Sequence, residues 1–405
     1  MASNTSSGDA QQKRNMLTKL YDSLVRGTNR PKNMRELGIA TLRTLPANIG
    51  MVRSFMKAVN LKKAQGEVMQ GLQNTIVIVG QANNGKSSLF NMLKGQQLSP
   101  VSPEAGTTRA LVRADFGPFT LIDTPGHLPE LMESGMQEAT VIVLLLDATK
   151  GLQEKDRELH TAIKKLNKPT IIAVNKVDAL KGHAAGDEMA NNIAVQLETP
   201  GVIPISALSG ENVAGELIPA MIEASPEAAL VIGRELPAYR REAAQRIIRN
   251  ATLASLMAGL EPIPLIDIPI LLGTQIRLVL RLAALYGEEM DSTDAMKHAR
   301  ELLITLAGGA GMRYLAEQAA KLVPFGGDFV AGAIAGAATF SIGQVALEYY
   351  EGGKRISPSH LRQLYTTFYQ RSRKQKSVEE WRQYAITGVD APLKIDLPRP
   401  AETTE

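Results

Sequence analysis

Eight residues, Gly80 to Ser87, fit the phosphate-binding pattern G-x-x-x-x-G-K-[ST]. An apolar, strand-like run (75–79) precedes them and an amphipathic run follows, which is the strand–loop–helix context that the pattern requires. In such a loop the backbone N–H groups surround phosphate, and the helix N-terminus adds a favourable dipole. Lys86 is predicted to reach the β- and γ-phosphates, and the Ser87 hydroxyl is predicted to ligate Mg²⁺. By itself the loop predicts only a nucleotide.

A second motif, Asp123-Thr-Pro-Gly126, follows the strand-like run 119–122. An aspartate at the end of a strand can hold the Mg²⁺ coordination shell, as the second acidic element of phosphate-loop enzymes does. Asp123 is therefore predicted to support the metal, and the Gly126 N–H is predicted to meet the γ-phosphate.

Two later motifs predict which base is bound. Asn175-Lys176-Val-Asp178 follows the apolar run 170–174, and Ser206-Ala207 follows the run 202–205. The Asp178 carboxylate can accept hydrogen bonds from both N1 and N2 of guanine, a donor pair that adenine lacks. A polar group left unpaired by the wrong base gives strong selection. With backbone N–H groups of the last loop on guanine O6, the ordered motifs predict GTP and GDP as ligands.

The segments GQANNGKSSLFN, EAGTTRA, DTPG, NKVD and ISALSGENV resemble the Era/TrmE branch of translation-factor-class GTPases, over about residues 74–225. The resemblance implies a three-layer α/β phosphate-loop domain with a mixed, mostly parallel sheet, and hydrolysis of GTP to GDP and phosphate. The implied nucleotide contacts are Asn83, Asn84, Gly85, Lys86, Ser87, Ser88, Asp123, Gly126, Asn175, Lys176, Asp178, Ser206 and Ala207.

The same resemblance implies catalytic roles for Lys86 and for two residues of the switch segments. Thr108, with Thr107 as the alternative, should close on Mg²⁺ and the γ-phosphate. His127 stands where related GTPases orient the attacking water; the alternative is a histidine turned to solvent. Asn83 stands where some members have an asparagine that coordinates K⁺, and an asparagine that only shapes the loop is the alternative.

Composition narrows the remaining possibilities. The 405 residues allow two or three domains. The chain has no cysteine, which excludes disulfides, thiolate metal sites and cysteine nucleophiles. The N-terminal residues show no charged-then-apolar signal, so a cytoplasmic location is expected.

The segment 11–70 is strongly basic, with twelve Lys or Arg against three acidic residues, a net charge of +9. Apolar residues between Ile39 and Val59 recur at steps of three and four, which predicts a helix with an apolar stripe, interrupted near Pro46. Such a segment can lie on an anionic membrane, or it can pack its stripe on the protein. A nucleic-acid partner is the least favoured of the three interpretations.

After residue 226 the strand-like runs stop and helical patterns begin. Residues 329–347 form a run of 19 without a charge. At ~1.5 Å per residue it just reaches across a ~30 Å hydrocarbon layer. Its small and polar residues, Thr339, Ser341 and Gln344 among them, suit a buried helix of a bundle, and both interpretations stay open. The segments EPIPLIDIP (261–269) and LVPFGG (322–327) resemble a helical domain of unknown function found on bacterial GTPases, over about residues 234–353. Members of that family are often expected at membranes.

These inferences divide the chain into five parts: 1–15 disordered, 16–70 basic and helical, 71–225 the GTPase domain, 226–355 an α-helical domain that can associate with membranes, and 356–405 a helical then disordered tail. The favoured function is a nucleotide-dependent switch at the cytosolic face of a membrane. The alternatives are an Era-like GTPase of RNA or ribosome assembly and a dynamin-like GTPase that forms nucleotide-dependent oligomers.

Overall fold

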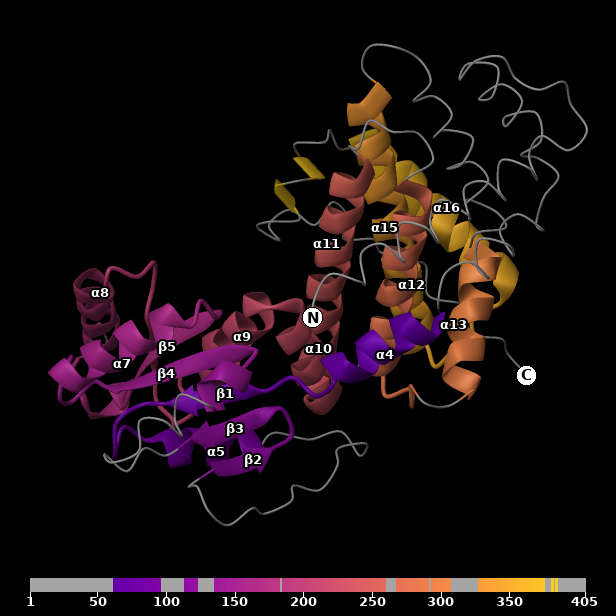
Figure 1. The fold of residues 1–405 in the computed structure, drawn as a ribbon. Helices are drawn as coiled ribbons and strands as arrows, with labels where there is room; N and C mark the ends of the chain where they lie inside the picture. The colour runs from indigo at the N-terminus through magenta and orange to yellow at the C-terminus, as the bar shows by residue number, and fades with distance from the viewer. Residues whose placement is uncertain are drawn as a thin grey trace, which may run out of the picture. The chain divides into compact units, whose positions relative to one another are not determined.

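A computed structural model of the chain describes residues 61–95, 113–122, 135–182, 184–259, 267–290, 293–306, 327–375, 380–381 and 383–384. The chain divides into two compact units. One contains residues 65–247 and 280–295, and the other contains residues 1–64, 248–279 and 296–405. Figure 1 shows the strands in the first unit and long helices in the second.

The sheet of the first unit has six strands in the order β2-β3-β1-β4-β5-β6. Neighbouring strands are parallel except for β2 and β3, which form an antiparallel hairpin. The mixed, mostly parallel sheet expected from the sequence is therefore confirmed. The strands are β1 (Ile76–Val79), β2 (Arg113–Phe116), β3 (Phe119–Ile122), β4 (Val141–Asp147), β5 (Thr170–Asn175) and β6 (Ile203–Ile205).

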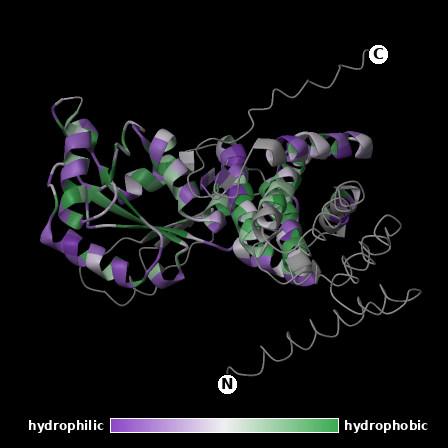
Figure 2. Ribbon diagram, turned by 90° about the horizontal axis from the view of Figure 1, so that it is seen from above, coloured by the Kyte–Doolittle hydropathy of each residue, from purple (hydrophilic) through white to green (hydrophobic). Residues whose placement is uncertain are grey.

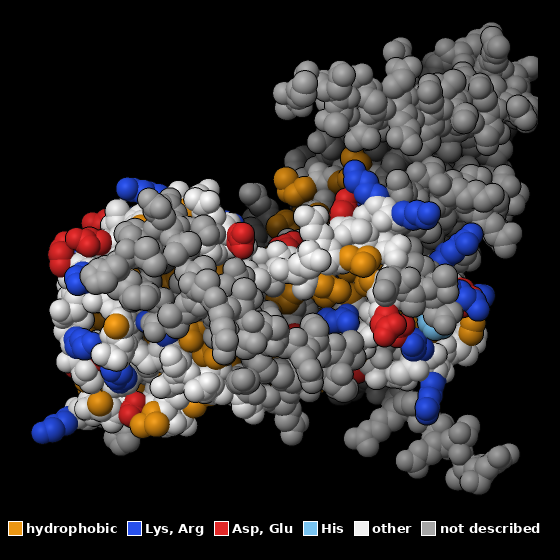
Figure 3. Space-filling view, turned by 60° about the horizontal axis from the view of Figure 1, so that its bottom comes forward, with side chains coloured by type: hydrophobic (Ala, Val, Ile, Leu, Met, Phe, Trp, Pro, Cys, Tyr) orange, Lys and Arg blue, Asp and Glu red, His pale blue; other side chains and the backbone are white. Residues whose placement is uncertain are grey.

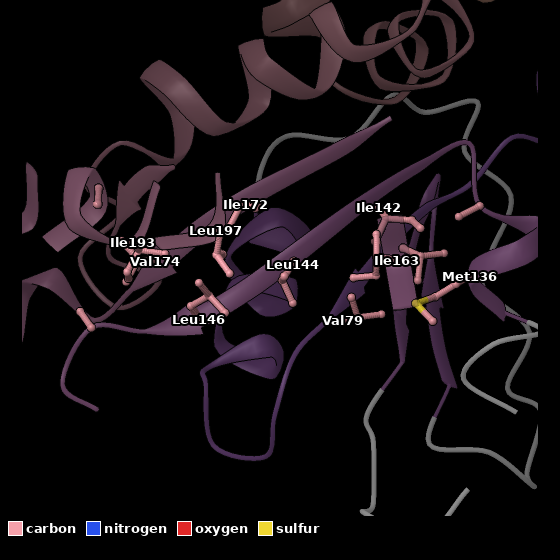
Figure 4. Packing of buried hydrophobic residues seen from close by; sticks show 14 of the residues in the cluster. Val79, Met136, Ile142, Leu144, Leu146, Ile163, Ile172, Val174, Ile193 and Leu197 are labelled. Atoms are coloured by element: carbon pink, nitrogen blue, oxygen red, sulfur yellow. The ribbon is translucent and has the colours of Figure 1, made fainter. Parts of the chain in front are cut away.

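Helices cover both faces of this sheet, which is why its central strands are apolar on both sides. Every residue of β1 and β4 is buried, as expected for parallel strands between two helical layers. On one face Ile163 of α7 (Glu154–Lys165) and Ile193 of α8 (Ala185–Leu197) join the core formed by β1, β4 and β5 (Figure 4). On the other face α5 (Lys86–Gly95) lies against β3, and α9 (Ile218–Ala224) lies against β5. The three-layer α/β fold is confirmed.

Several shorter elements complete this unit. They are α4 (Leu61–Gly71), the 3₁₀ helices η2 (Val177–Ala179) and η4 (Pro237–Tyr239), the π-helical turn η3 (Val213–Leu217) and α10 (Pro226–Glu235). The Ser225 hydroxyl accepts a hydrogen bond from the Ala228 N–H at 2.9 Å and so caps α10. Within α4, the Gln65 side chain donates to the Met290 carbonyl.

The C-terminal part of the chain is helical, as the sequence predicts. Its helices are α11 (Arg240–Gly259), α12 (Asp267–Leu285), α13 (Thr293–Leu306), α15 (Gly327–Glu351) and α16 (Pro358–Gln375). In Figure 2 these helices carry many hydrophobic residues, as does the sheet. The unit boundaries fall within α4, α11, α12 and α13, so the change from one unit to the other does not coincide with a loop.

Helix α15 contains the uncharged run 329–347. From Ile334 to Leu347 every residue is buried, and α15 packs along α16 in the second unit. Small residues permit close contact with α11: a Cβ placed on Gly336 would lie 3.5 Å from Leu256 Cβ, and one on Gly343 would lie 2.8 Å from Ile248 Cγ1. Inside this packing, the Thr339 hydroxyl donates to Ser255 at 2.8 Å and accepts from Gln275 at 3.2 Å. The run is thus the core helix of its unit, which is one of the two interpretations that the sequence left open.

None of the helices in the described ranges is both long enough and apolar enough to cross a membrane. The apolar stripe predicted between Ile39 and Val59 lies outside the described residues, as do residues 376–379, 382 and 385–405 of the expected tail.

Candidate nucleotide-binding site

The phosphate loop connects β1 to α5, and two of its glycines are required by close neighbours. Gly80 has φ +153°, and a Cβ there would overlap the backbone oxygen of Leu145 in β4. Gly85 has φ +89°, and a Cβ there would overlap the side-chain nitrogen of Asn175. Both positions therefore need glycine for space and for conformation. The loop passes directly over the ends of its neighbouring strands.

Lys86 is the first residue of α5, and its ammonium group lies within the loop. Its Nζ donates to the carbonyl oxygens of Gly80 at 2.9 Å and Gln81 at 2.8 Å, and the residue is buried. Ser87 and Ser88 follow in the first turn of α5 with exposed side chains. Lys86 is the residue that the sequence assigned to the β- and γ-phosphates, and Ser87 is the residue that it assigned to Mg²⁺.

Asn175, the last residue of β5, connects three loops through one side chain. Its Nδ2 donates to the Asn84 carbonyl at 2.9 Å, and its Oδ1 accepts from the Ala207 N–H at 2.8 Å. Asn84 in turn donates from its own Nδ2 to the Leu145 carbonyl at 2.8 Å. Asn84, Asn175 and Ala207 are all buried, so these bonds are shielded from competing water.

Lys176 makes a second link between the base motif and the phosphate loop. Its backbone is left-handed, with φ 70°, and its Nζ donates to the Asn83 carbonyl at 2.6 Å. The same Nζ lies 2.7 Å from Asp147 Oδ2. Asn83 is also left-handed, with φ 66°. Asparagine is one of the few residues other than glycine that adopt this conformation readily.

Asp147 was not predicted from the sequence. It ends β4 and is paired in register with Asn175, which ends β5. Burial by itself raises the pKa of the Asp147 carboxyl, but hydrogen bonds from Lys176 and Thr149, with the Lys176 charge, bring that pKa below its ordinary value. The available sequence signal was an aspartate directly after the long apolar run 141–146.

The remaining base-side residues surround the same edge of the sheet. Asp178 lies in η2 with an exposed carboxylate. Ser206 is fully buried, and its hydroxyl accepts from the backbone N–H groups of Leu208 at 3.3 Å and Ser209 at 3.0 Å. Ser206 therefore shapes the loop that presents the Ala207 backbone, while Asp178 is free to meet a ligand.

Four sequence-predicted residues, Thr108, Asp123, Gly126 and His127, lie outside the described residues, and so does Thr107. Among the residues that the structure describes, no group of three or more His, Asp or Glu side chains is placed to hold a metal ion by itself.

Comparison with known proteins agrees with this geometry. Residues 75–176 match the family model described as 50S ribosome-binding GTPase (MMR_HSR1), and residues 227–374 match that of a domain of unknown function, DUF697. The GTPase Era of Aquifex aeolicus is 35% identical over 175 residues, 38% of this chain and 56% of Era. The GTPase Der of Christiangramia forsetii is 32% identical over 184 residues, 41% of this chain and 40% of Der.

A crystal structure of an Aquifex aeolicus Era variant bound to GDP.AlF4- aligns with this chain at 31% identity and a TM-score of 0.31. The alignment covers 44% of this chain and 66% of the Era chain. The chain spans about half the length of the curated relatives it matches. The match to the GTPase family model covers the phosphate loop and the strands from β1 to β5, and the DUF697 match covers the helices from α10 to α16. The chain therefore joins a GTPase domain related to Era and Der to a helical domain of unknown function, DUF697.

Proposed function

We propose that the protein binds GTP and hydrolyses it to GDP and phosphate. The observation that carries this proposal is the bridge made by Asn175, which joins the phosphate loop at Asn84 to the base loop at Ala207. The loop proposed to bind the phosphates and the loop proposed to bind the base are thereby held at one edge of the sheet. Lys86 lies on the phosphate side of this edge and Asp178 on the base side. Ligands of open α/β sheets bind at this edge, beyond the carboxyl ends of the strands.

The proposed roles follow from the chemistry of each side chain. The Lys86 ammonium stabilises charge that develops on the β- and γ-phosphate oxygens during in-line attack by water. The Asp178 carboxylate accepts from the two donors of guanine. From the switch segments, Thr108 closes on the γ-phosphate and His127 orients the attacking water.

The exposed Ser87 hydroxyl at the first turn of α5 fits Mg²⁺, which prefers oxygen ligands and keeps part of its shell from phosphate and water. Thr108 and Asp123 complete the proposed set of residues that hold the ion. Mg²⁺ would neutralise charge on the β- and γ-phosphates. Asn83 is the proposed residue for K⁺, and its exposed side chain leaves its amide oxygen available.

Nucleotide titration of the full chain tests the proposal. We expect fluorescent GDP and GTP to bind in the presence of Mg²⁺ and ATP not to compete, because adenine cannot satisfy Asp178. Lys86→Ala should abolish phosphate release, and Asp178→Asn should shift preference from guanosine to xanthosine nucleotides. Hydrolysis that is faster in K⁺ than in Na⁺, with the difference lost in Asn83→Ala, would support the potassium role. ATP binding as tight as GTP binding would overturn the assignment.

We further propose that GTP hydrolysis acts as a switch at the cytosolic surface of a membrane, with the DUF697 helices sensing the nucleotide state. The basic segment 11–70 and the C-terminal helices supply the proposed contacts with anionic lipid. On the face drawn in Figure 3, described Lys and Arg side chains are interspersed with Asp and Glu. By its sequence, segment 11–70 carries a net charge of +9, which is why we propose it as the contact with anionic lipid. The proposed domain limits remain 71–225 for the GTPase domain and 226–355 for the helical domain.

Flotation with anionic vesicles, in GDP and in a non-hydrolysable GTP analogue, tests the cellular role. Binding that is lost in high salt or on deletion of residues 1–60 would assign the contact to the basic segment. Absence of flotation in every state would refute the membrane role. Ribosome cosedimentation would then favour the Era-like alternative, which the name of the matching family model suggests. Nucleotide-dependent oligomers in light scattering would favour the dynamin-like alternative.

A further inference from the structure

Asp147 carries a buried negative charge beside the proposed nucleotide site. Its side chain is 2% exposed. One carboxylate oxygen, Oδ1, accepts from the Thr149 N–H at 3.0 Å and from the Thr149 hydroxyl at 2.7 Å. The other oxygen, Oδ2, accepts from Lys176 Nζ at 2.7 Å. Lys150, at 3.5 Å and largely exposed, is a weaker partner. Thr149 thus fixes the carboxylate, and the fixed carboxylate faces Lys176.

The Lys176 ammonium bridges this carboxylate and the phosphate loop. The carbonyl of Asn83 accepts from Nζ at 2.6 Å, across 93 residues of sequence. Both Asn83 and Lys176 have left-handed backbones, which cost energy unless their surroundings hold them. The bridge therefore joins two residues with left-handed backbones, one from the phosphate loop and one from the base loop.

Lysine has a flexible stem and loses much rotamer freedom when it is held in one position. A buried carboxylate without its cation is also strongly unfavourable. The hydrogen bond to Asp147 therefore restricts the Lys176 side chain to one orientation, and the Lys176 ammonium compensates the negative charge of Asp147. The Asn175 bridge lies alongside, because Asp147 and Asn175 are register partners in β4 and β5.

We propose that Asp147 is a positioning residue for guanine-nucleotide binding, which acts by holding Lys176 and, through it, the phosphate loop at Asn83. This inference rests on the proposed function. Asp147 would act through Lys176 rather than through a contact of its own with the nucleotide. Its loss should weaken binding of GDP and of GTP alike, since both ligands use the same two loops.

Asp147→Asn keeps the size of the side chain and removes its charge. We expect the Kd for fluorescent GDP and for GTP to rise roughly 10- to 100-fold, the range for a lost hydrogen bond to a charged group. KM should rise by a similar factor, while kcat at saturating GTP stays within about three-fold, as expected for a loss of uniform binding.

The matched control is Asp156→Asn. Asp156 is also 2% exposed, and its carboxylate accepts from the Gln153 N–H at 3.1 Å at the start of α7. Asp156→Asn should lower resistance to urea and leave nucleotide Kd unchanged.

A double-mutant cycle separates positioning from general stabilisation. If Asp147 acts through Lys176, then Asp147→Asn should add no further loss of affinity in a Lys176→Met background. If Asp147→Asn shows no cooperative urea transition, Thr149→Val replaces it, because that change removes the hydroxyl hydrogen bond to Asp147 Oδ1 and leaves the carboxylate charge and the backbone N–H bond in place. Thr149→Val should raise Kd by about two- to five-fold, the effect of one hydrogen bond, and the rise should disappear beside Lys176→Met.

Three results would overturn the inference. The first is an Asp147→Asn protein that binds GDP as tightly as the wild type. The second is the same loss of affinity with and without Lys176. The third is an equal loss in the Asp156→Asn control. A wild-type protein that binds no guanine nucleotide would instead refute the proposed function itself, so the two failures are distinguishable.

Discussion

Replacing Asn175 with alanine tests the central feature of the site. The substitution removes two buried hydrogen bonds, to the Asn84 carbonyl at 2.9 Å and from the Ala207 N–H at 2.8 Å. Both partner residues are buried, at 2% and 5% exposure, so few waters can replace the lost side chain. An unsatisfied buried donor or acceptor costs about 1–3 kcal/mol. We therefore expect the free energy of unfolding of the GTPase unit to fall by about 2–5 kcal/mol.

Nucleotide affinity should fall as well, because the phosphate loop and the base loop lose their common tie. A loss of about 2 kcal/mol corresponds to roughly a 30-fold rise in the Kd for GDP. Urea unfolding followed by circular dichroism measures the first quantity, and calorimetric titration with GDP measures the second. Asn192→Ala is the control, because that amide accepts a hydrogen bond from Gln196 on the exposed surface of α8. An Asn175→Ala protein with the stability and GDP affinity of the wild type would refute this account of the site.

Three further changes probe the elements around the site. Ser225→Ala removes the cap on the Ala228 N–H and should lower the free energy of unfolding by about 1 kcal/mol, measured with urea; Ser225→Asp should restore it. Gly343→Ala places a Cβ 2.8 Å from Ile248 Cγ1 and should cost about 1–3 kcal/mol by overpacking, so an unchanged urea midpoint would contradict the packing of α15 on α11. Burial raises the pKa of the Glu235 carboxyl above its ordinary value of 4.5, and its Oε2 has no hydrogen-bond partner among the described residues. The ionised form therefore destabilises the folded state, so Glu235→Gln should be more resistant to urea than the wild type at pH 8, with a difference that shrinks as the pH falls towards 4.5. If the difference in urea resistance between Glu235→Gln and the wild type instead grew as the pH fell, the ionised carboxylate would be stabilising the folded state, and this reasoning would be wrong.

The phosphate-loop and Asn175 motifs could be placed at strand ends from the sequence because each is local. The phosphate loop follows the apolar run of β1, and the Asn175 motif follows that of β5, so strand, loop and following element are adjacent in sequence. Parallel strands then bring their carboxyl ends to one edge, which is a general rule of such sheets. The helical character of the C-terminal half was predictable for the same reason, since helical periodicity is a short-range signal.

The sequence alone could not decide which residues meet across the edge of the sheet. Asp147 lies 29 residues from Lys176, and Lys176 lies 93 residues from Asn83. These pairings depend on the order of β4 beside β5 and on the register that sets Asp147 against Asn175. No local pattern encodes that order.

Residues 329–347 show the same division in the helical part. Composition determined that this run is uncharged and rich in small residues, which is compatible with lipid or with protein around it. The tertiary structure decided that protein surrounds this run. Gly336 and Gly343 let α11 approach α15, and the Thr339 hydroxyl forms hydrogen bonds with Ser255 and Gln275. The sequence thus determined the chemistry available at each position. Long-range packing determined which groups share a site, because hydrogen bonds and van der Waals contacts act only over a few ångströms and exist only once the chain has folded.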